Sequence, residues 1–138
     1  MKLKYKAMVL SCMDPRFQPI VYNYLKKKKL IGKYSAFTIA GSSIGVTASK
    51  FKKWHKTFWD NIDTSIKLHK IKKLIVINHR DCGAAKIING KKEFNRANEI
   101  KIHKNSFLKL RKLFRKKYPK LTIELKLISL NQKVENLR

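Results

Sequence analysis

Residues 74–83 read Leu-Ile-Val-Ile-Asn-His-Arg-Asp-Cys-Gly, a short apolar run followed at once by polar residues. The run is continuous and rich in β-branched residues, which is typical of a strand buried on both faces of a parallel sheet. Directly after it the chain offers an imidazole, His79, and a thiol, Cys82, three positions apart. The stretch therefore predicts a strand of a parallel sheet with metal-binding side chains at its carboxyl end.

A second stretch repeats this pattern near the start of the chain. Residues 7–10 are apolar, and Cys12, Asp14 and Arg16 follow at two-residue spacing; Cys12 is the only cysteine besides Cys82. If both runs are parallel strands, both clusters emerge at the edge of the sheet where open α/β sheets bind ligands. Two thiols and an imidazole there predict a zinc site formed by Cys12, His79 and Cys82, with water or Asp14 in the fourth position.

The order of elements predicts the fold class. Strands and helices alternate, which indicates one doubly wound α/β domain over residues 1–138, with a mainly parallel four-stranded sheet flanked by helices. Strands are expected at residues 5–10, 34–39, 72–78 and 121–130, and helices at residues 19–29, 52–68, 83–88 and 93–117. A flavodoxin-like order, with the first strand beside the third, would bring Cys12 next to the turn at residues 79–82. Residues 131–138 are expected to form a polar tail or an arm that contacts a partner.

Two groups of residues are expected to have structural roles. Gly41 and Gly45, in the small-residue loop at residues 40–45, fit neither a dinucleotide fingerprint nor a P-loop and are expected to allow a turn or a close backbone approach. Trp54, Phe58 and Ile62 repeat at helical spacing and are expected in the core. The histidines outside the cluster, at positions 55, 69 and 103, are expected to be ordinary surface or core residues.

The composition is strongly basic. The 138 residues include 34 Lys and Arg against 8 Asp and Glu, a formal net charge of +26. Such a charge attracts anions and permits non-specific contact with nucleic acid, although most of the lysines are expected to be a solvated surface. No run approaches the roughly 18 apolar residues of a membrane span, and the start of the chain lacks the pattern of a signal peptide. These features predict a cytoplasmic protein, where free thiolates are available for metal.

The two clusters together resemble a known family. Residues 12–16, Cys-Met-Asp-Pro-Arg, and residues 79–83, His-Arg-Asp-Cys-Gly, are similar to the C-x-D-x-R and H-x-x-C motifs of the β-class carbonic anhydrases. Their order and separation match, and so does the Ala-Gly pair at residues 40–41 between them. Two features differ from the usual pattern: Pro15 replaces the usual serine or alanine, and residues 38–39 are Thr-Ile where the family commonly has Arg-Asn.

The resemblance implies an activity and an assembly. It implies that zinc, held by Cys12, His79 and Cys82, catalyses the reversible hydration of carbon dioxide to bicarbonate through a zinc-bound hydroxide. It assigns Asp14 and Arg16 to a carboxylate–arginine dyad that orients this hydroxide. It also implies a homodimer or a higher even oligomer.

Two other functions remain open at this stage. The same zinc site could hydrolyse an analogue of carbon dioxide, such as carbonyl sulfide or carbon disulfide. Alternatively, the chain is a catalytically silent, zinc-stabilised module whose basic surface binds nucleic acid without sequence preference, although it contains no nucleic-acid motif.

Overall fold

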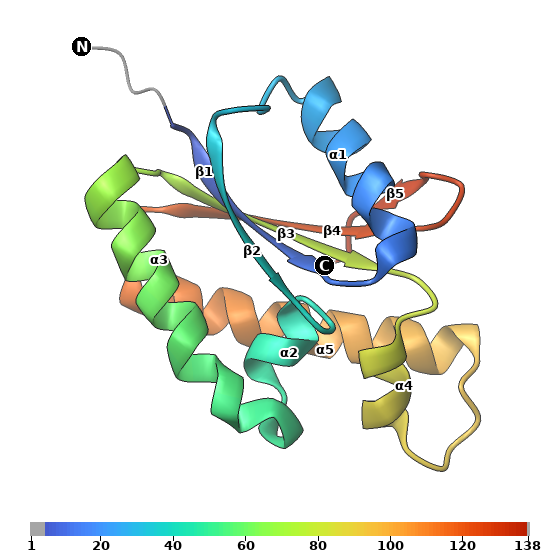
Figure 1. Cartoon of the computed structure of the whole chain (residues 1–138). Coiled ribbons are helices and arrows are strands. Elements are labelled where there is room, and N and C mark those ends of the chain that lie inside the picture. The colour runs from blue at the N-terminus through green and yellow to red at the C-terminus, as the bar shows by residue number, and fades with distance from the viewer. Residues whose placement is uncertain (1–4, 138) are drawn as a thin grey trace.

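The computed structural model describes residues 5–137 and contains a five-stranded sheet with helices on both faces (Figure 1). The strand order is β2-β1-β3-β4-β5; the first four strands in this order are parallel, and β5 is antiparallel to β4. The strands are β1 Ala7–Cys12, β2 Tyr34–Ile39, β3 Lys73–His79, β4 Thr122–Ile128 and β5 Val134–Glu135. The predicted α/β fold with a mainly parallel sheet is confirmed, and β1 lies beside β3 as expected.

The helices cover the two faces of the sheet unequally. Helix α1 covers one face, and α2, α3 and α5 lie on the other (Figure 1). Their bounds are α1 Gln18–Lys27, α2 Ser43–Thr47, α3 His55–His69, α4 Gly83–Asn89 and α5 Arg96–Lys117, with short 3-10 helices η1 Pro15–Phe17 and η2 Ser49–Trp54. In the part of the chain that the structure describes, no helix is long and apolar enough to cross a membrane.

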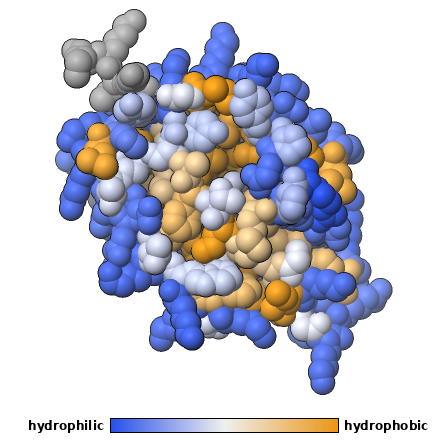
Figure 2. Space-filling view, viewed as in Figure 1, coloured by the Kyte–Doolittle hydropathy of each residue, from blue (hydrophilic) through white to orange (hydrophobic). Residues whose placement is uncertain are grey.

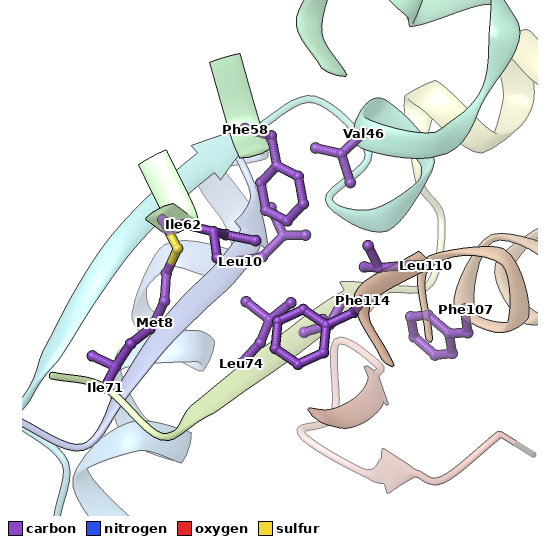
Figure 3. Close-up of a cluster of buried hydrophobic side chains, with 11 residues drawn as sticks. Met8, Leu10, Val46, Phe58, Ile62, Ile71, Leu74, Phe107, Leu110 and Phe114 are labelled. Carbon is purple, nitrogen blue, oxygen red and sulfur yellow. The ribbon is translucent and has the colours of Figure 1, made fainter. Parts of the chain in front are cut away.

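The core follows from the two-residue period of the strands. Alternate side chains of β1 and β3 point to opposite faces of the sheet, so each face presents its own apolar layer. Met8, Leu10 and Leu74 pack against α3 and α5, where Phe58 and Phe114 are fully buried (Figure 3). The side chains between them in sequence, with Ile128 of β4, pack against α1 on the other face. Burial on both faces explains why β1 and β3 are continuous apolar runs.

The start of α3 differs from the prediction. A regular helix from residue 52 would bury Trp54, but η2 precedes α3, and Phe51 has a non-helical backbone (φ −109°, ψ 27°). The ring of Trp54 lies at the surface, where it is 37% exposed and stacks on Phe51 with ring centroids 4.7 Å apart. Core placement is confirmed for Phe58 and Ile62 and is wrong for Trp54.

The expected polar tail contains a fifth strand. Residues 134–135 form β5, so the expected count of four strands is wrong by one. The carboxylate oxygens of Glu135 both accept hydrogen bonds from Nη2 of Arg80, each at 2.8 Å. A two-residue strand leaves no periodic signal in the sequence, and this one is held by an ion pair to the turn that follows β3.

The Glu135–Arg80 contact predicts a pH-dependent contribution to stability. The hydrogen bond from Arg80 lowers the pKa of Glu135 from its ordinary value of 4.5. The pair therefore stabilises the fold above that pH, and the contribution is lost as the pH falls through the lowered pKa of the folded state. Glu135→Gln is expected to reduce the free energy of unfolding by about 1 kcal/mol at neutral pH and by much less in acid.

Urea unfolding at pH 7 and pH 3 measures this difference. Glu93→Gln, at an exposed position, makes the same change of charge and serves as the matched control. A deficit for Glu135→Gln that is the same at both pH values would contradict a role for the ionised carboxylate.

One face of the molecule carries an apolar area. Figure 2 shows it in the middle of the view, ringed by hydrophilic side chains, and comparison with Figure 1 places it over β2, between α1 and α3. Strand β2 is an edge of the sheet, and its Ala36 and Thr38 are exposed. An exposed edge strand with an apolar surface is a site where another chain can pair.

Candidate metal centre

The three predicted metal ligands meet at the carboxyl edge of the sheet. Cys12 is the last residue of β1, His79 is the last residue of β3, and Cys82 immediately precedes α4. Because β1 and β3 pair in parallel, their ends lie side by side. The two sulfur atoms and an imidazole nitrogen all lie within 4.8 Å of one another, and each of the three residues is at most 6% exposed. These donor types are those that zinc prefers in proteins.

The imidazole of His79 is held in one orientation. Its Nδ1–H donates a hydrogen bond to the carbonyl oxygen of Arg80 at 2.7 Å, and the ring stacks on Phe17 with centroids 3.9 Å apart. Nε2 is therefore the unprotonated nitrogen of the neutral ring, and it is buried with no hydrogen-bond partner. A buried acceptor without a partner is costly unless something binds it. Beside two thiols, Nε2 fits a metal ion, and its Nδ1 contact is typical of metal-binding histidines.

The contact between the two thiols favours ionisation of Cys12. A hydrogen bond from Cys82 lowers the pKa of Cys12 well below its ordinary value of 9.0. Cys82 donates its proton in this contact and is buried, so its pKa is raised. The backbone N–H of Gly41 also donates to Sγ of Cys12 at 3.3 Å. The site thus contains a stabilised thiolate, which is the form of cysteine that binds metals.

Asp14 and Arg16 form an ion pair at the edge of this cluster. Oδ2 of Asp14 accepts a hydrogen bond from Nη2 of Arg16 at 2.8 Å, and Oδ1 accepts one from Nε at 3.1 Å. Oδ2 also lies 3.9 Å from Nε2 of His79, although Asp14 is not one of the three clustered donors. The contact with Arg16 lowers the pKa of Asp14 to about 2. The carboxylate is therefore ionised and held beside the cluster.

Pro15 fits between these two residues. It occupies the first turn of η1, where the ring favours the required φ and the missing N–H has no helical partner to lose. Asp14 is the N-cap of η1, and its Oδ1 accepts the backbone N–H of Arg16 at 2.9 Å. Pro15 is therefore compatible with the ion pair between Asp14 and Arg16.

The small-residue loop supports the cluster through close backbone approach. Gly41 has φ +79°, and a Cβ there would lie 2.6 Å from the Cβ of Ala84. A Cβ on Gly45 would lie 2.2 Å from the carbonyl oxygen of Ala40. The structural role predicted for both glycines is confirmed. The loop also contains α2, a short helix that the sequence pattern did not predict.

A buried polar network behind Cys82 was not predicted from sequence. Oε2 of Glu99 accepts a hydrogen bond from the backbone N–H of Cys82 at 3.0 Å and lies 3.6 Å from Nε2 of His103. Nδ1 of His103 lies 2.9 Å from the amide nitrogen of Asn78, which also donates to Oγ of Ser43 at 2.7 Å. His103 is a core residue, as expected, but it connects α5 to the turn that carries Cys82.

A signal for this network exists in the sequence. Glu99, His103 and Ser106 are spaced so that they share one face of a helix with Phe107, Leu110 and Phe114, and all six are buried. The periodic apolar stripe of α5 thus continues as a polar stripe toward its N-terminus. If the helical spacing of the buried phenylalanines and leucine is extended toward the N-terminus of α5, it predicts that these three polar residues are also buried.

Comparison with known proteins identifies the family. The sequence profile of the family described as "Putative carbonic anhydrase" matches residues 2–118. The chain belongs to this family. Two relatives of this carbonic anhydrase family member have similar sequences. One is an uncharacterized protein of Rickettsia conorii, 29% identical over 132 residues, and the other is an uncharacterized protein of Rickettsia bellii, 28% identical over 132 residues. The match covers 95% of this chain in both cases, and 71% and 80% of the two relatives.

Solved structures of β-carbonic anhydrases share the fold. One from Sordaria macrospora superposes with a TM-score of 0.71 at 10% identity, covering 99% of this chain and 82% of that one. The carbonic anhydrase from Glaciozyma antarctica gives a TM-score of 0.64 at 15% identity, covering 100% of this chain and 85% of that one. Membership of a carbonic anhydrase family is thus confirmed, and the fold is that of solved β-carbonic anhydrases.

Proposed function

We propose that this chain catalyses the reversible hydration of carbon dioxide to bicarbonate at a zinc ion bound by Cys12, His79 and Cys82. The observation that carries the proposal is the buried, unpartnered Nε2 of His79, which lies with two thiols beside an ionised carboxylate. Membership of the carbonic anhydrase family supports the reaction, and the donor set supports the metal.

Asp14 and Arg16 act as the dyad in this proposal. In carbonic anhydrases, bound zinc lowers the pKa of a water molecule to about 7. Oδ2 of Asp14 accepts a hydrogen bond from the attacking oxygen and so orients it toward carbon dioxide. Arg16 donates hydrogen bonds to both oxygens of the Asp14 carboxylate, so this carboxylate is ionised at neutral pH. Asp14 therefore accepts hydrogen bonds and does not donate one.

Arg16 also connects the two halves of the site. Its Nη1 donates to Oδ2 of Asp81 at 2.8 Å, and its Nη2 donates to the carbonyl oxygen of Asp81 at 3.0 Å. Asp81 precedes Cys82 and has a left-handed backbone, with φ 57°. A single guanidinium thus joins the turn after β1 to the turn after β3, which keeps Asp14 in register with the metal ligands.

The positive charge of the chain favours binding of an anionic product, and its free thiols fit a reducing compartment. The net charge of +26 attracts bicarbonate, which the enzyme uses in the reverse direction. Cys12 and Cys82 are free thiols, and zinc needs both of them reduced. We therefore propose that the chain acts in the cytoplasm.

The proposed assembly is a homodimer or a higher even oligomer. The apolar surface over edge strand β2 supports it (Figure 2). The Sordaria macrospora enzymes with the same fold are described as tetrameric.

A charge placed on β2 tests this assembly. Ala36→Glu, at an exposed position of β2, would bury a carboxylate if a second copy covers this surface. Sedimentation velocity is expected to show dimers or larger species for the wild type and mainly monomers for the variant. Lys56→Glu on the exposed side of α3 is the control. A wild type that is monomeric at high concentration would contradict the proposed assembly.

Stopped-flow hydration of carbon dioxide tests the proposed function. Zinc-replete protein at mildly alkaline pH is expected to acidify the solution well above the buffer rate. Acetazolamide, which binds the Coccomyxa β-carbonic anhydrase, is expected to inhibit it. The same protein stripped of metal is the control. One zinc per chain without hydration would overturn the proposal and leave the sulfur analogues of carbon dioxide as the next substrates to assay.

A further inference from the structure

Glu99 is a buried carboxylate in contact with the candidate metal centre. It lies in the first half of α5 and is 6% exposed, although an unpaired charge at such a position is costly. Its Oε2 accepts the backbone N–H of Cys82 at 3.0 Å. No role described so far uses this carboxylate, so its burial needs another explanation.

The hydrogen bonds behind Glu99 have a defined direction. The backbone N–H of Ser43 donates to Oδ1 of Asn78 at 3.2 Å, which places the amide nitrogen of Asn78 toward Ser43 Oγ and His103. An amide nitrogen donates, so Nδ1 of His103 accepts, and the proton of the neutral ring is on Nε2. Ser106 donates to the carbonyl oxygen of His103 at 2.8 Å, so the Oγ of Ser43 donates to that of Ser106.

The network therefore ends at Glu99. Nε2 of His103, which carries the proton, lies 3.6 Å from Oε2 of Glu99 and has no hydrogen-bond partner. The carboxylate oxygen thus receives the backbone N–H of Cys82 from one side and faces the imidazole of His103 on the other. Through His103 and Asn78, the position of Glu99 depends on α5, β3 and α2 together.

The backbone of the turn between His79 and Cys82 is held at four points. The N–H of Arg80 donates to the carbonyl oxygen of Ile128 in β4 at 3.1 Å, and the carbonyl oxygen of Arg80 accepts from His79. Arg16 donates to the carbonyl oxygen of Asp81, and Glu99 accepts the N–H of Cys82. The turn needs this support because Asp81 has a left-handed backbone, which a non-glycine residue rarely adopts.

We propose that Glu99 is a positioning residue for the metal centre: it holds the backbone of Cys82 so that this thiol faces Cys12 and His79. The inference rests on the proposed function, because it takes Cys82 to be a zinc ligand. Glu99 is not one of the three clustered donors. It acts through Cys82, as groups that orient metal ligands commonly do.

The zinc dissociation constant tests this role. Competition with a chromophoric chelator is measured for the wild type, Glu99→Ala and Glu99→Gln. Glu99→Ala removes the acceptor for Cys82 and is expected to weaken zinc binding by about 10- to 100-fold. Glu99→Gln keeps the shape and one acceptor oxygen but loses the charge-assisted contact, so a smaller loss of about 10-fold is expected.

Two further measurements separate positioning from general destabilisation. Ser106→Ala breaks the network at its far end, and it is expected to lower the urea midpoint of the metal-free protein but leave the zinc dissociation constant within about twofold of the wild type. Loaded with Co²⁺, the wild type is expected to show thiolate-to-cobalt absorption bands, and Glu99→Ala is expected to change their intensity. Circular dichroism of the metal-free variants establishes that each one folds, and Glu99→Gln carries the test if Glu99→Ala does not.

The outcomes distinguish this inference from the proposed function. A wild type that binds no zinc overturns both. A wild type that binds zinc, together with Glu99→Ala and Glu99→Gln variants that bind it equally well with an unchanged cobalt spectrum, overturns only the role of Glu99. Equal losses of zinc affinity in Ser106→Ala and Glu99→Gln would also overturn it, because a general loss of stability would then explain both.

Discussion

Cys82→Ser is expected to abolish stoichiometric zinc binding and, with it, the stabilisation that zinc provides. Cys82 is 1% exposed, and its sulfur clusters with Sγ of Cys12 and the imidazole of His79. A serine hydroxyl remains protonated near neutral pH and is a poor zinc ligand, whereas a thiolate is a good one. The variant loses one of three protein donors.

The energetic consequence appears mainly when metal is present. A ligand that binds only the folded state stabilises it by about 2.7 kcal/mol when its free concentration is 100 times the dissociation constant. The wild type is therefore expected to unfold at a higher temperature with zinc than with a chelator, and Cys82→Ser is expected to show almost no such difference. In the metal-free protein, a serine hydroxyl can still donate to the thiolate of Cys12, so the two proteins should unfold at similar temperatures.

Metal content after dialysis and thermal unfolding with and without zinc measure this effect. Cys12→Ser should also lose stoichiometric zinc binding, because it removes the other thiol of the cluster. Ser11→Cys, which adds a thiol to the strand beside the site, is the control for a simple change in cysteine number. One zinc per chain in Cys82→Ser would remove Cys82 from the ligand set.

Asp14→Asn is expected to retain zinc and to lose about 10²- to 10³-fold in turnover. Asp14 is not one of the three clustered donors, so the metal site remains complete without its charge. The amide presents one acceptor where the carboxylate presents two, and Arg16 then loses one of its two charged partners, with Asp81 remaining. The attacking oxygen therefore loses the acceptor that orients it, while the ligands stay in place.

The steady-state rate of hydration and the zinc content of the same preparation measure this prediction. Asp60→Asn makes the same chemical change in an exposed i,i+4 ion pair with Lys56 on α3 and is the matched control. Wild-type turnover in a zinc-loaded Asp14→Asn variant would exclude Asp14 from the mechanism. Loss of zinc from that variant would instead mean that Asp14 is itself a ligand.

The sequence predicted the ligand cluster because two local signals coincide. Each of β1 and β3 is an apolar run long enough to be recognised, and a side chain of a type that can bind metal lies at the carboxyl end of each. Because the two strands are parallel neighbours in the sheet, Cys12 and His79 lie close together. The positions of individual boundaries were less accurate: β1 ends at Cys12, which was expected in the turn that follows the strand.

Other features depended on contacts that no local pattern encodes. Glu135 of strand β5 contacts Arg80, and the 3-10 helix η2 that contains Trp54 has a non-helical backbone at Phe51. The second partner of Arg16, the carboxylate of Asp81, becomes available only when the two turns meet. In each case the contacting residue is distant in sequence or the backbone is not regular helix. The periodic spacing of side chains in the sequence therefore does not predict the feature.

By itself, the sequence determined the α/β class and the identity of the clustered thiols and imidazole, whereas the pairing of β1 with β3 was an expectation that the structure confirmed. Those features follow from side-chain periodicity and from donor types at strand ends, which are properties of short segments. Only the tertiary structure decided that Nε2 of His79 is buried without a partner and that Glu99 contacts the backbone of Cys82. Both depend on the side chains of four separate elements packing around one turn, which is a property of the folded chain alone.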